Sequence, residues 1–153
     1  MSEISAVLGL GAEFVFEGTT YRVAPCCYLV KGQYENYLEG EAMRAIMNRV
    51  GEVSDYVVRE LLSIYTRDCA AKVYHFDGSV SVRSRELLPG RKRLAALQLH
   101  KGQPGLSNEA SMDLVEKIFD SGEAAITALE SSMARADADP NVPKPYRKSV
   151  TPG

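Results

Sequence analysis

The feature that most constrains this chain is the stretch from Leu94 to Ala136, where three apolar-periodic segments are separated by two breaks that contain glycine. Its apolar residues recur mainly at steps of three and four, the spacing that places side chains on one face of a helix. The Pro104-Gly105 pair marks the first break, and Gly122 can end the second segment. The stretch therefore predicts three consecutive helices, with Leu94–Leu99 and Met112–Phe119 in the core.

The third of these segments carries a narrow apolar stripe. Ile126, Leu129 and Met133 lie at steps of three and four, and the remaining positions are mostly Ala, Ser and Glu. A thin amphipathic helix of this kind suits the docking of a partner, so we predict that these three residues bind another protein. The same pattern also fits a helix that folds back and closes the core. The sequence leaves both alternatives open.

The composition and the end of the sequence indicate one domain followed by a tail. A length of 153 residues, with 45% hydrophobic and 25% charged residues, is typical of a single folded domain. After the third segment the chain reads DADPNVPKPYRKSVTPG, in which four prolines stand among polar neighbours. We therefore predict a single α+β domain over residues 1–136 and a flexible, proline-containing tail over residues 137–153.

Residues 13–24, EFVFEGTTYRVA, have the alternation of a β-hairpin around a short turn. The side chains predicted to share its buried face, by the two-residue period of a strand, are Phe14, Phe16, Tyr21 and Val23. Pro25 ends the second strand because it has no N–H to donate. The apolar run from Cys26 to Lys31 fits either a third strand or the start of a helix.

Two helices are predicted next. The first covers Tyr34–Asn48, and the second begins at the capping residue Ser54 and runs to about Ala71. The second has a wide apolar face, made of Val57, Val58, Leu61, Leu62, Tyr65 and Cys69. A few residues join the two helices, so we expect antiparallel neighbours, an αα-hairpin.

A second hairpin is predicted at Asp77-Gly78, a pair typical of the type I′ turn. Its arms would be Val73–Phe76 and Ser79–Val82. Because a lone hairpin is marginally stable in water, these strands are expected to join or pack beside the first pair in a small antiparallel sheet. The predicted fold class is α+β, with short antiparallel β-hairpins packed with an αα-hairpin and C-terminal helices.

A cluster of basic residues lies between Arg83 and Lys101, where six basic residues stand against one acid. Arg91, Lys92 and Arg93 form its centre. The cluster fits a contact with nucleic-acid phosphates, and it equally fits a solvated helix face or an edge that pairs with an acidic partner. No nucleic-acid-binding motif or interleaved aromatic residues accompany it, and the chain has 18 basic against 20 acidic residues. Nucleic acid is therefore not favoured.

The sequence indicates no catalytic, metal or cofactor site. Three cysteines, two of them adjacent, are an odd set that we interpret as reduced, and His75 and His100 lie far apart in the sequence. There is no dinucleotide loop, P-loop, nucleophile elbow or paired-histidine motif. The start of the sequence, MSEISAVLGLG, lacks the pattern of a secretory signal or a membrane span, which predicts a cytosolic protein with no membrane contact.

Two stretches resemble small tail assembly chaperones of long-tailed bacteriophages. Residues 94–122 are similar to the C-terminal pattern of that family: a helix, a basic residue with a proline turn, and a Ser/Thr-x-Glu that opens an amphipathic helix. The hairpin FVFEGTTYRVAP, followed directly by helices, is similar to the way those proteins begin. The Asp77-Gly78 stretch has no counterpart. Members of the family bind the long hydrophobic tape measure protein before tail tube assembly, so the resemblance implies that apolar helix faces here are partly a client surface.

We therefore expect a non-enzymatic protein without a cofactor that binds another protein. The first hypothesis is a phage tail chaperone that holds a tape measure-like client in the cytoplasm of an infected bacterial host. One alternative is a structural virion component, such as a neck or baseplate subunit. The other is a nucleic-acid-associated accessory protein that uses the Arg91, Lys92 and Arg93 cluster. The identity of the partner and the oligomeric state, including a homo-oligomer, stay open.

Overall fold

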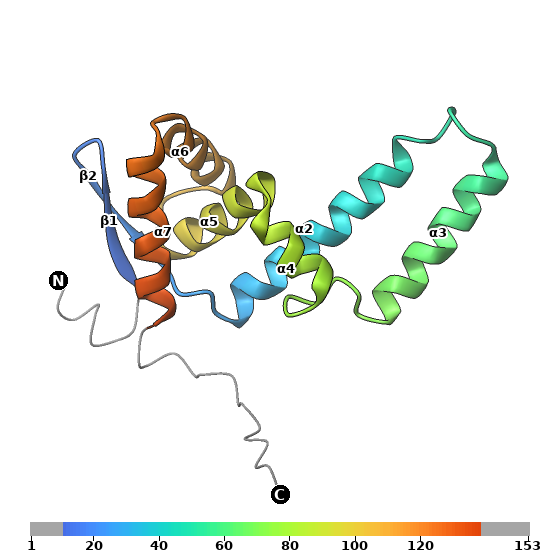
Figure 1. The fold of residues 1–153 in the computed structure, drawn as a ribbon, viewed down its shortest axis with the longest axis horizontal. Helices are drawn as coiled ribbons and strands as arrows, with labels where there is room; N and C mark the ends of the chain where they lie inside the picture. The colour runs from blue at the N-terminus through green and yellow to red at the C-terminus, as the bar shows by residue number, and fades with distance from the viewer. Residues whose placement is uncertain (1–10, 139–153) are drawn as a thin grey trace, which may run out of the picture.

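The computed structural model describes residues 11–138, and Figure 1 shows how their elements are arranged. In chain order these are β1 (Ala12–Phe16), β2 (Thr19–Val23), α2 (Tyr28–Met47), α3 (Asp55–Ala70), α4 (Ser79–Glu86), α5 (Leu88–Gly102), α6 (Asn108–Asp120) and α7 (Glu123–Asp137). The predicted α+β class is confirmed. Most of the predicted tail, residues 139–153, lies outside the described residues, as do residues 1–10.

Strands β1 and β2 form the predicted first hairpin. They pair antiparallel, with Phe14 opposite Tyr21 and Ala12 opposite Val23. Glu17 and Gly18 both have positive φ, at 49° and 77°, which is the backbone that a two-residue type I′ turn requires. Phe14 and Val23 are buried, and Phe16 and Tyr21 pack at the margin of the same core, so the predicted buried face is confirmed.

The three helices predicted between Leu94 and Ala136 are present as α5, α6 and α7, and they pack with the hairpin around the main core. Ser107 caps α6 by accepting the N–H of Ala110 at 3.1 Å. The fully buried large apolar side chains of this core include Val23, Leu99, Val115, Ile118 and Leu129. We call the hairpin with α5, α6 and α7 the body. None of the helices within residues 11–138 is both long and apolar enough to cross a bilayer.

A smaller second cluster joins the body to α2. It buries Val30, Tyr34 and Leu38 from α2, Phe76 from the loop after α3, and Leu97 from α5. Tyr34 also exchanges a hydrogen bond of 2.8 Å with Ser84 in α4. The ambiguous run after Pro25 is thus the start of a helix, because Val30 and Tyr34 are four residues apart and both reach this cluster.

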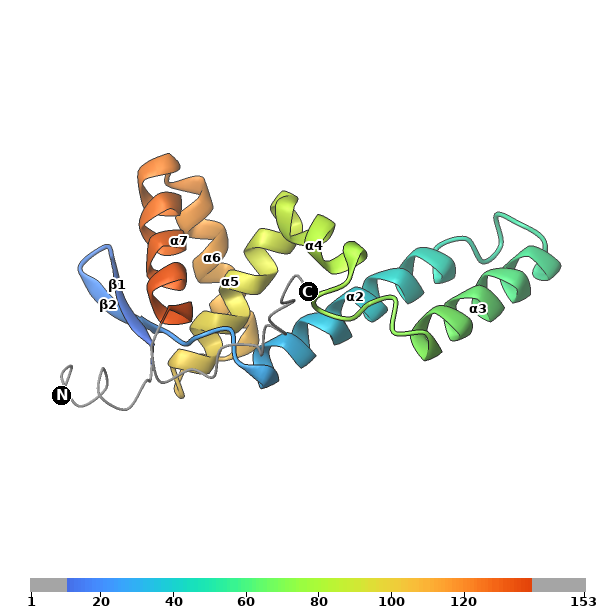
Figure 2. The same cartoon turned by 60° about the horizontal axis from the view of Figure 1, so that its bottom comes forward.

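Helices α2 and α3 form the predicted αα-hairpin, which we call the arm. Figures 1 and 2 show it extending away from the body, with the α2–α3 loop at its tip. Ser54 caps α3 as predicted, accepting the N–H of Val57 at 3.4 Å, and Gly51 has φ of 89° in the connecting loop. Among the described elements, α3 packs against α2, and no residue of Asp55–Ala70 is buried.

The predicted second hairpin at Asp77-Gly78 is wrong. Residues 71–78 form a loop, and Ser79 begins the helix α4. Gly78 has φ of −76° at the start of that helix, so it does not adopt the positive φ of a type I′ turn. The reason is a set of tertiary contacts, since Phe76 is buried in the second cluster. The helix that follows it buries Ser81 and lets Ser84 form a hydrogen bond with Tyr34, whereas Val80 and Val82 stay exposed.

The contact between α4 and α5 depends on Gly90. A Cβ at this position would lie 2.0 Å from the carbonyl oxygen of Ser84 and 2.7 Å from the hydroxyl of Tyr34. By contrast, a Cβ at Gly40, inside α2, would meet no atom within 4 Å. Gly90 is therefore required by close packing, whereas Gly40 is not.

We predict opposite effects of alanine at these two glycines. Gly90→Ala lowers the free energy of unfolding by about 1–3 kcal/mol, the usual cost of overpacking. Gly40→Ala raises it by roughly 0.5–1 kcal/mol, because alanine is the better helix former. Urea denaturation followed by circular dichroism measures both. A stabilised Gly90→Ala protein would contradict the packing described here.

The end of α7 is tied to the segment between β2 and α2. Asp137 Oδ1 accepts the N–H of Cys26 at 2.7 Å and an Nε2–H of Gln98 at 3.2 Å. Gln98 Nε2 also donates to the carbonyl oxygen of Ala24 at 2.9 Å. Burial raises the pKa of the Asp137 carboxyl above its ordinary value, although both hydrogen bonds act in the opposite direction.

This raised pKa predicts a pH-dependent difference between two substitutions. Folding favours the protonated acid, so the contribution of Asp137 to stability decreases as pH rises through its folded-state pKa. Asp137→Asn keeps the hydrogen-bond acceptor without the charge, so this variant is at least as stable as the wild type at pH 7. The difference in the free energy of unfolding between the two proteins shrinks below about pH 4. Asp137→Ala loses the acceptor and costs about 1 kcal/mol. Denaturation at several pH values measures this, and equal losses in both variants would contradict it.

Candidate functional site

The three residues predicted to bind a partner lie in α7, against the body. Leu129 is fully buried in the main core, and Met133 packs at its margin. Ile126 is half-buried. Of the two alternatives left by the sequence, the fold has the helix closing the core, so this stripe is not a free surface in the described conformation.

The predicted basic patch is occupied by contacts inside the protein. Arg91 pairs with Glu130 of α7, and Lys92 Nζ lies 2.8 Å from Glu116 Oε2 of α6. The guanidinium of Arg93 lies 4.9 Å from the ring centroid of Tyr37 in α2. Each of the three side chains thus links α5 to a different helix, and the charges of Arg91 and Lys92 are each paired with a carboxylate.

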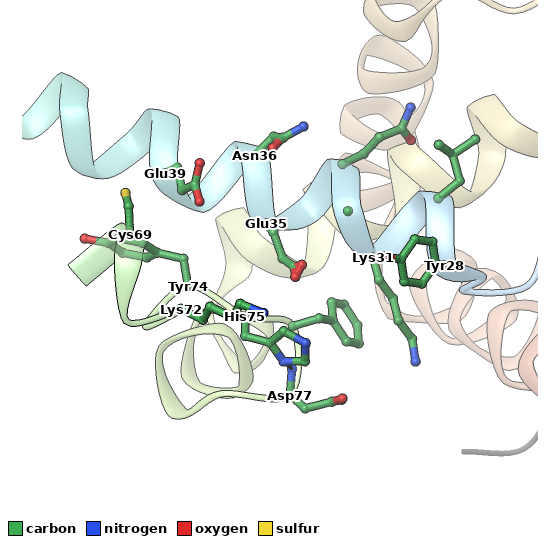
Figure 3. A pocket seen from close by; sticks show the side chains of 14 residues that line it. Tyr28, Lys31, Glu35, Asn36, Glu39, Cys69, Lys72, Tyr74, His75 and Asp77 are labelled. Atoms are coloured by element: carbon green, nitrogen blue, oxygen red, sulfur yellow. Dashed lines mark hydrogen bonds between the residues drawn. The ribbon is translucent and has the colours of Figure 1, made fainter. Parts of the chain in front are cut away.

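A groove runs along α2 where the loop after α3 approaches it (Figure 3). Its volume is about 660 Å³. The lining residues come from two segments, namely Tyr28, Leu29, Lys31, Gly32, Gln33, Glu35, Asn36 and Glu39 of α2, and Cys69, Lys72, Tyr74, His75, Phe76 and Asp77 at and after the end of α3. Figure 3 shows Lys31 and Glu35 extending from α2 toward the loop that carries His75. The sequence did not predict this groove, because its two sides are about 40 residues apart.

One wall of the groove is anchored by Phe76. Arg85 lies over its ring at 3.9 Å from the centroid and donates to its carbonyl oxygen at 2.9 Å. Lys31 Nζ is 5.3 Å from the same ring, and Tyr34 meets it edge-on. These contacts, together with the burial of the ring, hold the 71–78 loop against α2.

His75 lines the groove, and Cys26 lies just before the groove in the chain. His75 Nδ1 accepts the N–H of Asp77 at 3.3 Å, so this nitrogen is engaged within the loop. Among residues 11–138, no group of three or more His, Cys, Asp or Glu side chains could hold a metal ion. Burial raises the pKa of the nearby Cys26 thiol to about 12, so that this cysteine stays protonated at neutral pH.

A second exposed surface lies on the arm. Large apolar side chains at its tip are open to solvent, and Ile64 lies two helical turns after Val57 on the same side of α3. We call this set the arm surface; its members are Met47, Val50, Tyr56, Val57 and Ile64. The apolar face that the sequence predicted for α3 shares only Val57 with the arm surface, and its other members are half-buried. The sequence therefore did not predict this surface.

Comparison with known proteins provides no relative for this chain. Family models, curated proteins and solved structures were compared with it, and none matches.

The Phe76 contacts predict how the groove responds to mutation. Phe76→Ala removes a side chain that is 6% exposed, so we expect a loss of roughly 3–5 kcal/mol and faster tryptic cleavage after Lys72 in the loosened loop. Tyr28→Ala is the control within the same groove. Tyr28 is 93% exposed, so its removal should change stability by less than about 0.5 kcal/mol. Equal cleavage rates in the wild type and Phe76→Ala would contradict the anchoring role of Phe76.

Proposed function

We propose that this chain is a non-enzymatic protein-binding factor in phage tail morphogenesis, which holds a hydrophobic, tape measure-like client in the cytoplasm of an infected bacterial host. The single observation that carries the proposal is the arm surface on an outlying helical hairpin. The resemblance of residues 14–25 and 94–122 to tail assembly chaperones gives the proposal its biological setting.

The exposure of the arm surface supports the binding of an apolar client. Val57 and Ile64 are 37% and 42% exposed, and Met47, Val50 and Tyr56 are more exposed still. Large apolar side chains that stand open to solvent can mark a protein-interaction surface. A client helix laid along α3 would bury Val57 and Ile64, which share one side of that helix, as an amphipathic helix does in an apolar groove.

The separation of α3, the outer helix of the arm, from the body also supports this role. No residue of α3 enters either buried cluster, so the arm surface can accept or release a client without exposing the main core. The internal pairing of Arg91, Lys92 and Arg93 favours a protein client over a nucleic acid.

We predict that Val57→Asp combined with Ile64→Asp weakens client binding at least tenfold. Burying such a side chain completely contributes roughly 1.5–3 kcal/mol, and about two fifths of each is still exposed, so the pair contributes roughly 1.2–2.4 kcal/mol. About 1.4 kcal/mol corresponds to a tenfold change in affinity. The test co-expresses the chain with the tape measure protein of a long-tailed phage and measures how much of that protein stays soluble and co-purifies.

Val15→Asp is the matched control. Val15 is 62% exposed on β1, and Figure 1 shows the hairpin and the arm at opposite ends of the molecule. Val15→Asp should therefore co-purify the client as the wild type does. Circular dichroism confirms that both variants are folded. Undiminished client recovery by the folded Val57→Asp, Ile64→Asp protein would overturn the proposal.

A further inference from the structure

The groove along α2 begins beside the point where the chain leaves the described fold. Asp137, the last residue of α7, accepts the N–H of Cys26, and Tyr28 is the first residue that lines the groove. The described part of the chain therefore ends, at Ala138, next to one end of the groove.

The chemical character of this segment matches that of the groove. Within residues 139–153 stand four prolines, Tyr146, and three basic residues, Lys144, Arg147 and Lys148, against one acid, Asp139. The groove presents an aromatic and aliphatic pair at its entrance, since Tyr28 is 93% and Leu29 51% exposed. Farther along are three acids, Glu35, Glu39 and Asp77, with Lys31 and Lys72 as the basic residues.

Proline-rich segments are suited to grooves lined by aromatic residues. The polyproline II backbone is already extended, so little conformational entropy is lost on binding. Lys31 lies over the Phe76 ring. The acids of α2 that line the groove are Glu35 and Glu39. Basic residues placed among prolines can pair with these two carboxylates, although each exposed pair contributes modestly.

The length of the segment fits the length of the groove. At about 1.5 Å per residue, the part of α2 from Tyr28 to Glu39 covers roughly 17 Å. At about 3.1 Å per residue, the segment from Ala138 to Tyr146 spans roughly 25 Å in a polyproline II conformation. Tyr146, Arg147 and Lys148 can therefore reach Glu35 and Glu39.

We propose that residues 139–153 bind in this groove of their own chain, with the prolines on Tyr28 and Leu29, and with Tyr146, Arg147 and Lys148 beside Glu35 and Glu39. Covalent tethering gives the segment an effective concentration of the order of millimolar, so contacts that are weak individually suffice. This binding does not depend on the client function of the arm.

The test is an amide NMR comparison of the full chain with a variant that carries Tyr146→Ala, Arg147→Ala and Lys148→Ala. We expect shifts at Leu29, Glu35 and Glu39, no shifts in α6, and higher backbone mobility of residues 140–148 in heteronuclear NOE data. The matched control changes Ser149, Val150 and Thr151 to alanine and leaves the groove signals near their wild-type positions. Unchanged groove signals in the first variant would overturn the proposal.

A charge exchange and a dilution series complete the test. Arg147→Glu with Lys148→Glu should release the segment, and adding Glu35→Lys with Glu39→Lys should restore the low mobility of residues 140–148. In the wild type the groove signals should not depend on protein concentration. If they do, the segment binds a second copy of the chain, and the intramolecular proposal fails.

Discussion

The packing of α5 is the constraint on which the rest of the structure depends. Its residues from Ala95 to Leu99 are all buried, because the helix lies between the two clusters. Ala95, Ala96 and Leu99 face the main core, and Leu97 faces the cluster that holds α2 and the 71–78 loop. Gln98 makes the backbone and side-chain hydrogen bonds that fix the linker before α2. The position of the arm therefore follows from a helix that is not part of it.

Local patterns predicted the elements whose formation is decided by nearby residues. The first hairpin with its short turn, the cap at Ser54, and the helices of the Leu94–Ala136 stretch all follow from short-range rules. The Asp77-Gly78 hairpin failed because two distant contacts outweigh its turn preference. Phe76 is buried against α2, and Ser84 bonds Tyr34, which is 50 residues away. A sequence pattern holds no information about such partners.

Helical periodicity could not show which apolar stripes are covered by other elements. The stripes of α3 and α7 have similar helical spacing, and periodicity reports which side chains share a face but not what covers it. The α7 stripe lies against the hairpin, α5 and α6, and so it became core, whereas α3 packs on α2. The prediction that Ile126, Leu129 and Met133 bind a partner thus falls on a stripe that packs against the body, with Leu129 fully buried. The groove lay beyond sequence reasoning altogether, since its walls meet through the fold.

The distribution of burial sets α3 apart from the rest of the described fold. The two buried clusters take their side chains from the hairpin, α2, α5, α6, α7 and the Phe76 loop, and none from α3. An outer helix with few buried contacts can open locally at a lower free energy than the global unfolding of the body. Substitutions on the arm surface therefore act mainly on what the arm contacts. Substitutions at Leu129 or Met133 act first on folding, so a loss of binding there would say nothing about a docking site.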